Sequence, residues 1–194
     1  EGEGSSTTRE AAHLNHEYVF DPRHPTPSVG GPSFHAWNSA ERDQADVEGR
    51  SDVLVYSSEP LLEGVSIAGP VSLTLSNVHI SHADSSDGTA DLKDPVSAFL
   101  ARRSKDEGTV SALLVGRLCR VRPDGTSTNV CEGYTSVAGP AVTSKDGVRG
   151  AALAREVELS LGNTLCHFGR GDCIRLQVCS GCYPRIATNT GTGA

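Results

Sequence analysis

The chain has 194 residues, which is enough for one domain with a substantial core and too few for two large domains. Only 37% of the residues are hydrophobic, and 21 glycines with 10 prolines favour a loop-rich β-protein over a helical bundle. The formal net charge of -7, with Arg102-Arg103 as the main basic cluster, excludes nucleic acid as a partner because a polyanion would be repelled.

The sequence contains neither a long apolar run nor a basic start followed by an apolar stretch. We therefore expect no membrane partner and no secretion signal in this piece, which favours a cytoplasmic location. The chain opens with Glu1 and has no methionine, so we interpret it as a piece of a longer polypeptide.

Residues 1–17 are polar and unpatterned, which predicts a flexible lead, and residues 18–194 are expected to form a single β-sandwich domain. The domain begins with Tyr18-Val19-Phe20 and the proline-rich stretch 21–32. Because proline fixes φ and lacks an N–H group, this stretch should run extended along a surface.

The next part of the chain predicts three short strands and an insertion. Residues 52–61 are rich in β-branched side chains, and residues 65–67 and 71–75 alternate, with Gly69-Pro70 expected to separate them. Residues 77–108 are hydrophilic and lack this pattern, so we predict an insertion over about 77–109, built of loop with a brief helix within 95–103.

A hairpin is predicted around Pro123-Asp124-Gly125, with strands over 110–122 and 126–134. A loop centred on Gly125 would place Cys119 opposite Cys131. Tight strand pairs seldom fit disulfide geometry, which favours free thiols there. The six cysteines allow fifteen complete pairings, so the sequence leaves their state open. Residues 136–152 are expected to form an irregular loop.

The last patterned segment has two alternating runs, 157–161 and 174–178, joined across Gly169-Arg170-Gly171-Asp172. This pattern predicts a second hairpin whose final strand stops near Tyr183, before Pro184, with loop over 187–194. Seven or eight short strands with almost no helix predict an all-β fold, a β-sandwich of jelly-roll type.

Several blocks carry a family resemblance: YVFDPRHPTPSVGG (18–31), residues 43–61, RLCRVRPDGTSTNVCEGYTS (117–136) and residues 157–193. Together they resemble the C-terminal, galactose-binding-domain-like jelly roll of the X-Pro dipeptidyl-peptidase and cocaine-esterase family of serine hydrolases. The family's Asp-Thr-Asp-Phe segment is not recognisable here, and the insertion over 77–109 departs from its pattern.

The resemblance implies a non-catalytic domain that packs on an α/β-hydrolase domain and helps to shape its substrate pocket. It implies that the parent protein cleaves an ester or amide through a Ser-His-Asp triad housed in the other domain. No catalytic residue can be carried over, because the matching positions lie outside this chain. We expect no cofactor and no metal, and a homo-oligomer is left open.

Three local motifs resemble functional sites but also have ordinary structural explanations. The run 64–68 lacks the last glycine of the G-x-S-x-G elbow and lies among predicted strands. His79 and His82, with Asp84, Asp87 and Asp91, could hold a divalent metal, but solvated loop polarity explains the same residues and is favoured because no rigid frame holds the ligands.

Cys179-x-x-Cys182 closes a predicted strand, so alternation should place the two sulfurs on opposite faces, and a catalytic role is disfavoured. His167 is expected to pack or to bond the backbone. Two alternative functions remain: a free-standing carbohydrate- or peptide-binding module, and a repurposed family member with its own activity. The first would use stacking aromatics, with the candidates Tyr18, Trp37, Tyr56, Tyr134 and Tyr183.

Overall fold

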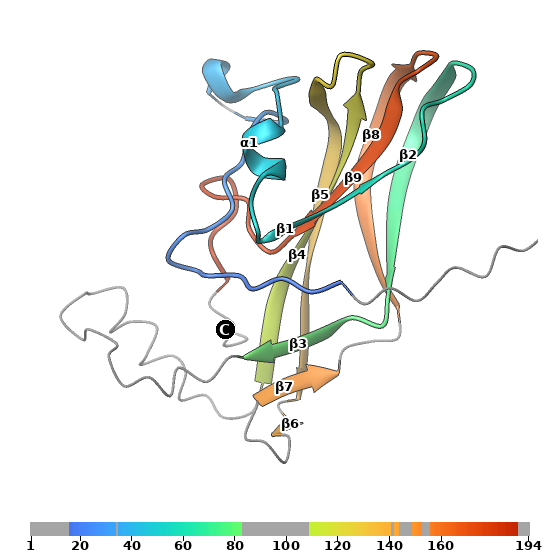
Figure 1. The fold of residues 1–194 in the computed structure, drawn as a ribbon. Helices are drawn as coiled ribbons and strands as arrows, with labels where there is room; N and C mark the ends of the chain where they lie inside the picture. The colour runs from blue at the N-terminus through green and yellow to red at the C-terminus, as the bar shows by residue number, and fades with distance from the viewer. Residues whose placement is uncertain are drawn as a thin grey trace, which may run out of the picture.

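The computed structural model describes residues 16–33, 35–82, 109–140, 142–143, 149–152 and 156–189, and these are mostly β-strands (Figure 1). The strands are β1 (Val53–Ser57), β2 (Val65–Ser76), β3 (His79–His82), β4 (Thr109–Val121), β5 (Ser127–Pro140), β6 (Val142–Thr143), β7 (Arg149–Ala152), β8 (Glu156–Phe168) and β9 (Cys173–Cys179). A 3-10 turn covers Ala36–Asn38, and α1 is the single turn Ala45–Glu48. No helix in the described ranges is long and apolar enough to cross a membrane.

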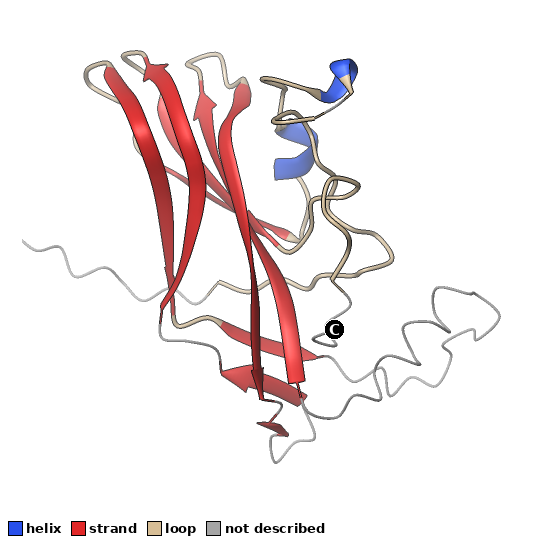
Figure 2. Ribbon diagram, turned by 180° about the vertical axis from the view of Figure 1, so that it is seen from behind, coloured by secondary structure: helices blue, strands red, loops and turns tan. Residues whose placement is uncertain are grey.

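The strands form two main layers, visible face to face in Figure 2. One layer is a four-stranded sheet in the order β1-β9-β4-β5, and the other is the antiparallel pair β2-β8. A small third sheet in the order β3-β7-β6 lies at one end. The core between the two layers is built from Leu114, Leu118, Val157, Leu159, Leu161 and Phe168. The prediction of an all-β sandwich is confirmed.

The hairpin predicted around Gly125 is present as β4 and β5, and Gly125 has a φ of 89°. The prediction that Cys119 faces Cys131 was wrong, because the register beside the turn is centred on Asp124 instead of Gly125, with Val121 opposite Ser127, and a bulge then follows between Leu118 and Cys119. Cys131 lies opposite Leu118, and Cys119 lies opposite Asn129. All six cysteines are free thiols, as the geometry of tight strand pairs favoured.

Residues 65–76 form one continuous strand, so the predicted break at Gly69-Pro70 was wrong. Gly69 takes a φ of 126°, a conformation that glycine adopts at little steric cost, and the ladder to β8 continues through it. Within the described residues β2 pairs only with β8, and a proline is tolerated on such an edge strand.

The two strands of the last segment, β8 and β9, do not form the predicted hairpin. β8 pairs with β2, whereas β9 lies between β1 and β4 in the other sheet. The turn between them is closed by the Asp172 carboxylate, which accepts a hydrogen bond from the Gly169 N–H at 2.7 Å. This turn therefore carries the chain from one layer to the other, and β9 ends at Cys179 rather than near Tyr183.

Two segments expected to be loop contain strands. His79–His82, inside the predicted insertion, pairs with Arg149–Ala152, and β5 runs on to Pro140. These pairings rest on backbone hydrogen bonds between residues distant in sequence. The local pattern of side chains therefore does not predict them. The predicted brief helix over 95–103 and most of the predicted lead lie outside the described residues.

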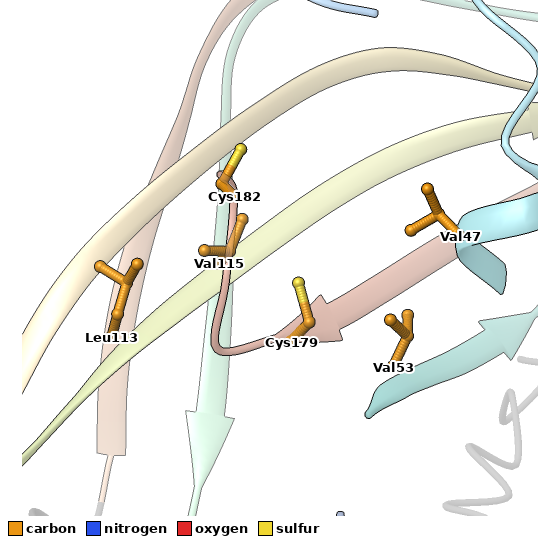
Figure 3. Packing of buried hydrophobic residues seen from close by; sticks show 6 residues of the cluster. All are labelled: Val47, Val53, Leu113, Val115, Cys179 and Cys182. Atoms are coloured by element: carbon orange, nitrogen blue, oxygen red, sulfur yellow. The ribbon is translucent and has the colours of Figure 1, made fainter. Parts of the chain in front are cut away.

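The four-stranded sheet is covered on both faces. Its second face is packed by the N-terminal segment (residues 16–33), by α1 and by the C-terminal segment (residues 180–189). The cluster there consists of Val47, Val53, Leu113, Val115, Cys179 and Cys182 (Figure 3). Val29 and Ile186 pack against it. Burial on both faces explains why β4 reads as a nearly continuous apolar run.

The close packing of β5 against β8 predicts that one added methyl group at Gly133 lowers the stability of the domain. A Cβ atom on the buried Gly133 of β5 would overlap the carbonyl oxygen of Ser160 on β8. We expect Gly133→Ala to lower the free energy of unfolding by about 3 kcal/mol, because backbone cannot move aside as a side chain can. Gly169→Ala is the matched control, since the nearest atom to its added Cβ is 3.6 Å away. Equal urea midpoints for the two variants would contradict this account.

Candidate functional site

A serine and a histidine meet on the outer face of the β2-β8 pair. The Ser66 hydroxyl and His167 Nδ1 are 3.0 Å apart, and both residues are exposed. Ser66 lies within a strand rather than at a strand-to-helix turn, and no carboxylate bonds His167 among the described interactions. The pair therefore lacks the orienting third group of a catalytic triad. The expectation that His167 packs or bonds backbone was wrong for its side chain.

The candidate metal ligands are not brought together in the part of the chain that the structure describes. His79 lies on β3, whereas Asp84, Asp87 and Asp91 lie outside the described residues, as does the side chain of His82. No group of three His, Cys, Asp or Glu side chains converges among the described residues.

Cys179 and Cys182 share one apolar cluster, so the expectation of opposite faces was wrong (Figure 3). The strand ends at Cys179 and the chain turns through Gly181, after which the alternation of a strand no longer applies. Burial raises the pKa of both thiols, which keeps them protonated at neutral pH. These cysteines act as small apolar side chains, in contrast to the activated thiols of redox motifs.

The five aromatic candidates for sugar stacking lie on different elements. Trp37 stacks on His35, and Tyr56 stacks on His16. Tyr18 is largely buried and contacts the Ser180 hydroxyl at 2.7 Å, and burial raises its pKa to about 12. Tyr134 is exposed on β5, beside a shallow hollow that includes Thr188 and Asn189. Ring contacts within the described residues thus join none of the five to another.

The most developed polar site is buried against the second face of the four-stranded sheet. Its centre is Arg117 on β4, whose side chain is only 2% exposed. The guanidinium donates to Glu132 Oε2 at 2.9 Å, to Gln177 Oε1 at 2.9 Å and to Gln44 Oε1 at 3.1 Å. A buried arginine requires this many acceptors, because an unpaired charge away from water costs several kcal/mol.

A second group of contacts extends the site toward α1. Glu48 accepts hydrogen bonds from Gln177 at 3.0 Å and from the Ser127 hydroxyl at 2.6 Å, and it pairs with Arg175 at 2.6 Å. Gln177 thus contacts both Arg117 and Glu48 and joins the two groups. The resulting network fixes α1 on the sheet through side-chain contacts as well as through Val47.

Arg185 ties the two terminal segments into the same network. Its guanidinium pairs with Glu132 and donates to the carbonyl oxygen of Gly30. Gly31 has a φ of 72°, and a Cβ atom there would lie 3.0 Å from Glu132 Oε1 and 3.2 Å from Arg185 Nη1. Two features therefore require glycine at this position: the positive φ and the lack of space for a Cβ atom. The network holds the N-terminal and C-terminal segments together across the sheet.

A separate group of hydrogen bonds around Asp52, which we call the Asp52 lock, connects the N-terminal segment to the start of β1. Asp52 is buried and accepts hydrogen bonds from Thr26 Oγ1 at 2.8 Å and from Arg50 Nε at 2.7 Å. Burial alone would raise the pKa of Asp52, but the hydrogen bonds from Arg50 and Thr26 outweigh it and hold the pKa below its usual value. Arg50 also donates to the His24 carbonyl at 2.8 Å.

Sequence reasoning did not single out this network, although two signals for it were present. Arg117 interrupts the apolar run of β4 at a position where strand alternation places its side chain on the same face as Val115 and Cys119, and all three are buried. Gln177 does the same on β9, between the apolar neighbours Leu176 and Val178. Two polar residues at core positions of adjacent strands indicate a buried pair, and the register aligns Arg117 with Gln177.

Comparison with known proteins decides the family. The family model described as the X-Pro dipeptidyl-peptidase C-terminal non-catalytic domain matches residues 2–194. The chain belongs to this family.

Relatives of the family domain are much longer than this chain. The cocaine esterase of Rhodococcus sp. (strain MB1 Bresler) is 29% identical over 177 residues, which cover 91% of this chain and 26% of that protein. An aminopeptidase from a marine sediment archaeon (Thaumarchaeota) has a similar fold, with a TM-score of 0.61, 22% identity, and coverage of 95% of this chain and 28% of that one. An α-amino acid ester hydrolase gives a TM-score of 0.59 at 22% identity, covering 91% and 26%.

The chain thus spans about a quarter of the relatives that it matches. The predicted resemblance to this C-terminal domain is confirmed.

The Arg117 network predicts that replacing Arg117 on β4 destabilises the domain much more than replacing Arg122 in the turn that follows β4. We expect Arg117→Met to lower the free energy of unfolding by about 3 kcal/mol, because Glu132, Gln44 and Gln177 lose their buried partner. The control is Arg122→Met, since Arg122 is 39% exposed and faces Glu41 at 3.6 Å, and it should change stability by less than about 1 kcal/mol. Urea unfolding followed by circular dichroism measures both. A small loss for Arg117→Met would show that the network is not a main source of stability.

The Asp52 lock predicts a pH dependence of defined sign. Because the folded pKa lies below the ordinary Asp value, the stabilisation is present above about pH 4 and is lost as pH falls through the folded pKa. We expect Asp52→Asn to cost about 2 kcal/mol at pH 7 and to approach the parent chain in stability once the pH falls below the folded pKa of Asp52. Asp46→Asn on the exposed face of α1 should match the parent chain throughout. A gap between Asp52→Asn and the parent that stays constant with pH would contradict this assignment.

Proposed function

We propose that this chain is the accessory domain of a longer serine hydrolase that cleaves an ester or an amide. In this proposal it packs on an α/β-hydrolase domain, stabilises it and forms part of the wall of its substrate pocket. The observation that carries the proposal is the match of residues 2–194 to a C-terminal non-catalytic domain family. The quarter-length coverage of the relatives supports it, because most of each relative lies outside the matched region.

The substrate class follows from what the relatives share in their names. One is an esterase, one an amino acid ester hydrolase and one an aminopeptidase, and the family is named for cleavage after a penultimate proline. Each of these reactions attacks a carbonyl carbon that bears an oxygen or nitrogen leaving group. A Ser-His-Asp triad in the hydrolase domain would supply the nucleophile and the base for that attack.

The proposal is tested on the polypeptide isolated from its natural source with an antibody raised against this chain. We expect an intact mass far above that of the 194-residue chain, together with turnover of a p-nitrophenyl ester or of an Xaa-Pro anilide. A fluorophosphonate probe should label one serine of the isolated polypeptide and none in residues 1–194. Heat-denatured polypeptide serves as the labelling control.

Two results would contradict the proposal. Turnover by the 194-residue chain alone would favour a family member with its own activity. A native mass close to that of the 194-residue chain, without turnover, would favour a free-standing binding module.

A further inference from the structure

The two main layers of the sandwich differ in width, which leaves part of the wider one uncovered. Side chains of both β2 and β8 reach β4, because a Cβ atom on Gly116 would be 2.8 Å from Leu73 Cδ2 and 3.1 Å from Leu161 Cδ2. β8 also lies against β5, where Gly133 meets Ser160. The sheet order β1-β9-β4-β5 therefore places β1 and the outer part of β9 beyond the two-stranded layer, although Val178 on the inner face of β9 is still buried.

Exposure rises along one cross-strand row on this inner face. The register aligns Leu118 of β4 with Leu176 of β9, and Leu176 with Tyr56 of β1. Leu118 is 8% exposed, Leu176 is half-buried, and Tyr56 is 37% exposed. The apolar core thus continues to the outer edge of the sheet instead of ending in polar side chains.

The opposite layer shows the same gradient. Four inward residues of β8, namely Val157, Leu159, Leu161 and Phe168, are buried and Cys166 is half-buried, whereas the inward residues of β2 are at most half-buried. Val65, paired with the fully buried Phe168, is 41% exposed. We call the surface formed by Leu54, Tyr56, Val65, Ile67 and Leu176 the open side of the sandwich.

The chain enters its described part at the open side. His16 stacks on Tyr56 with ring centroids 5.1 Å apart and planes 1° apart, and His16 Nδ1 lies 3.0 Å from the Tyr56 hydroxyl. Two residues later, Tyr18 is anchored by Ser180, next to the end of β9. A domain joined through residues 1–15 is held near this surface, because a short tether gives it a high effective concentration there.

We propose that the open side is the surface on which the hydrolase domain docks. This inference rests on the proposed function, in which the larger domain precedes this one. The chemistry fits an intramolecular interface, with an aromatic ring and aliphatic side chains at the centre and the polar residues Ser57 and Ser66 nearby. Two other exposed apolar residues lie elsewhere, because Leu165 is on the outer face of β8 and Trp37 stacks on His35, and exposed apolar residues of this kind are common on monomeric surfaces.

Hydrogen exchange tests the inference by comparing the natural polypeptide with the 194-residue chain. We expect the amides of β1 and the first half of β2 to exchange at least about tenfold more slowly in the natural polypeptide, because docking removes local opening there. The amides of β5 and α1 should exchange equally in both. Val65→Asp in the natural polypeptide should abolish the extra protection, while Leu165→Asp, 85% exposed on the outer face of β8, should leave it intact.

Other results would overturn the docking surface in distinguishable ways. If the natural polypeptide turns over its ester but β1 and β2 exchange as in the short chain, the hydrolase proposal stands and the docking surface is wrong. If β1 and β2 are already protected in the short chain and lose that protection when residues 1–15 are deleted, the chain's own lead covers the open side. If protection depends on protein concentration together with a dimer in gel filtration, a second copy covers it. If the natural polypeptide has no hydrolase domain, the proposed function itself fails.

Discussion

The buried guanidinium of Arg117 is the constraint on which the arrangement of the second face depends. A charge at 2% exposure is tolerated only with a complete set of acceptors, and these come from β5, β9 and the residue before α1. Glu132 then also pairs with Arg185, whose other contact is the Gly30 carbonyl. Satisfying one arginine therefore fixes where both terminal segments lie on the sheet.

Local pattern in the sequence was sufficient for the elements whose partners are close along the chain. The β4-β5 hairpin could be predicted because its turn residues and both alternating strands lie within one short stretch. The approximate extent of β1 and the first part of β8 could also be predicted, since β-branched content and alternation mark half-buried strands, although β8 runs on to Phe168. The number of short strands predicted the β-sandwich, and the family resemblance implied the same fold.

The errors in strand pairing have a common physical origin in contacts between distant residues. β8 and β9 adjoin in sequence, yet each finds its partner elsewhere, β8 with β2 and β9 with β1 and β4. Likewise β3 pairs with β7 some seventy residues away, and neither carries a clear alternating pattern. The Arg117 network was missed for the same reason, because its members become neighbours only after the sheet forms and both ends of the chain fold back over it.

Coverage of both faces of the main sheet also limits where this domain can act. One face of β4 is occupied by β2 and β8, and the other by the terminal segments and α1, so the sheet offers little free surface at its centre. What remains exposed is the edge, where the row from Leu118 to Tyr56 leads the apolar core outward. A domain built this way is suited to binding another folded body along one side, and a non-catalytic role beside a hydrolase requires such a surface.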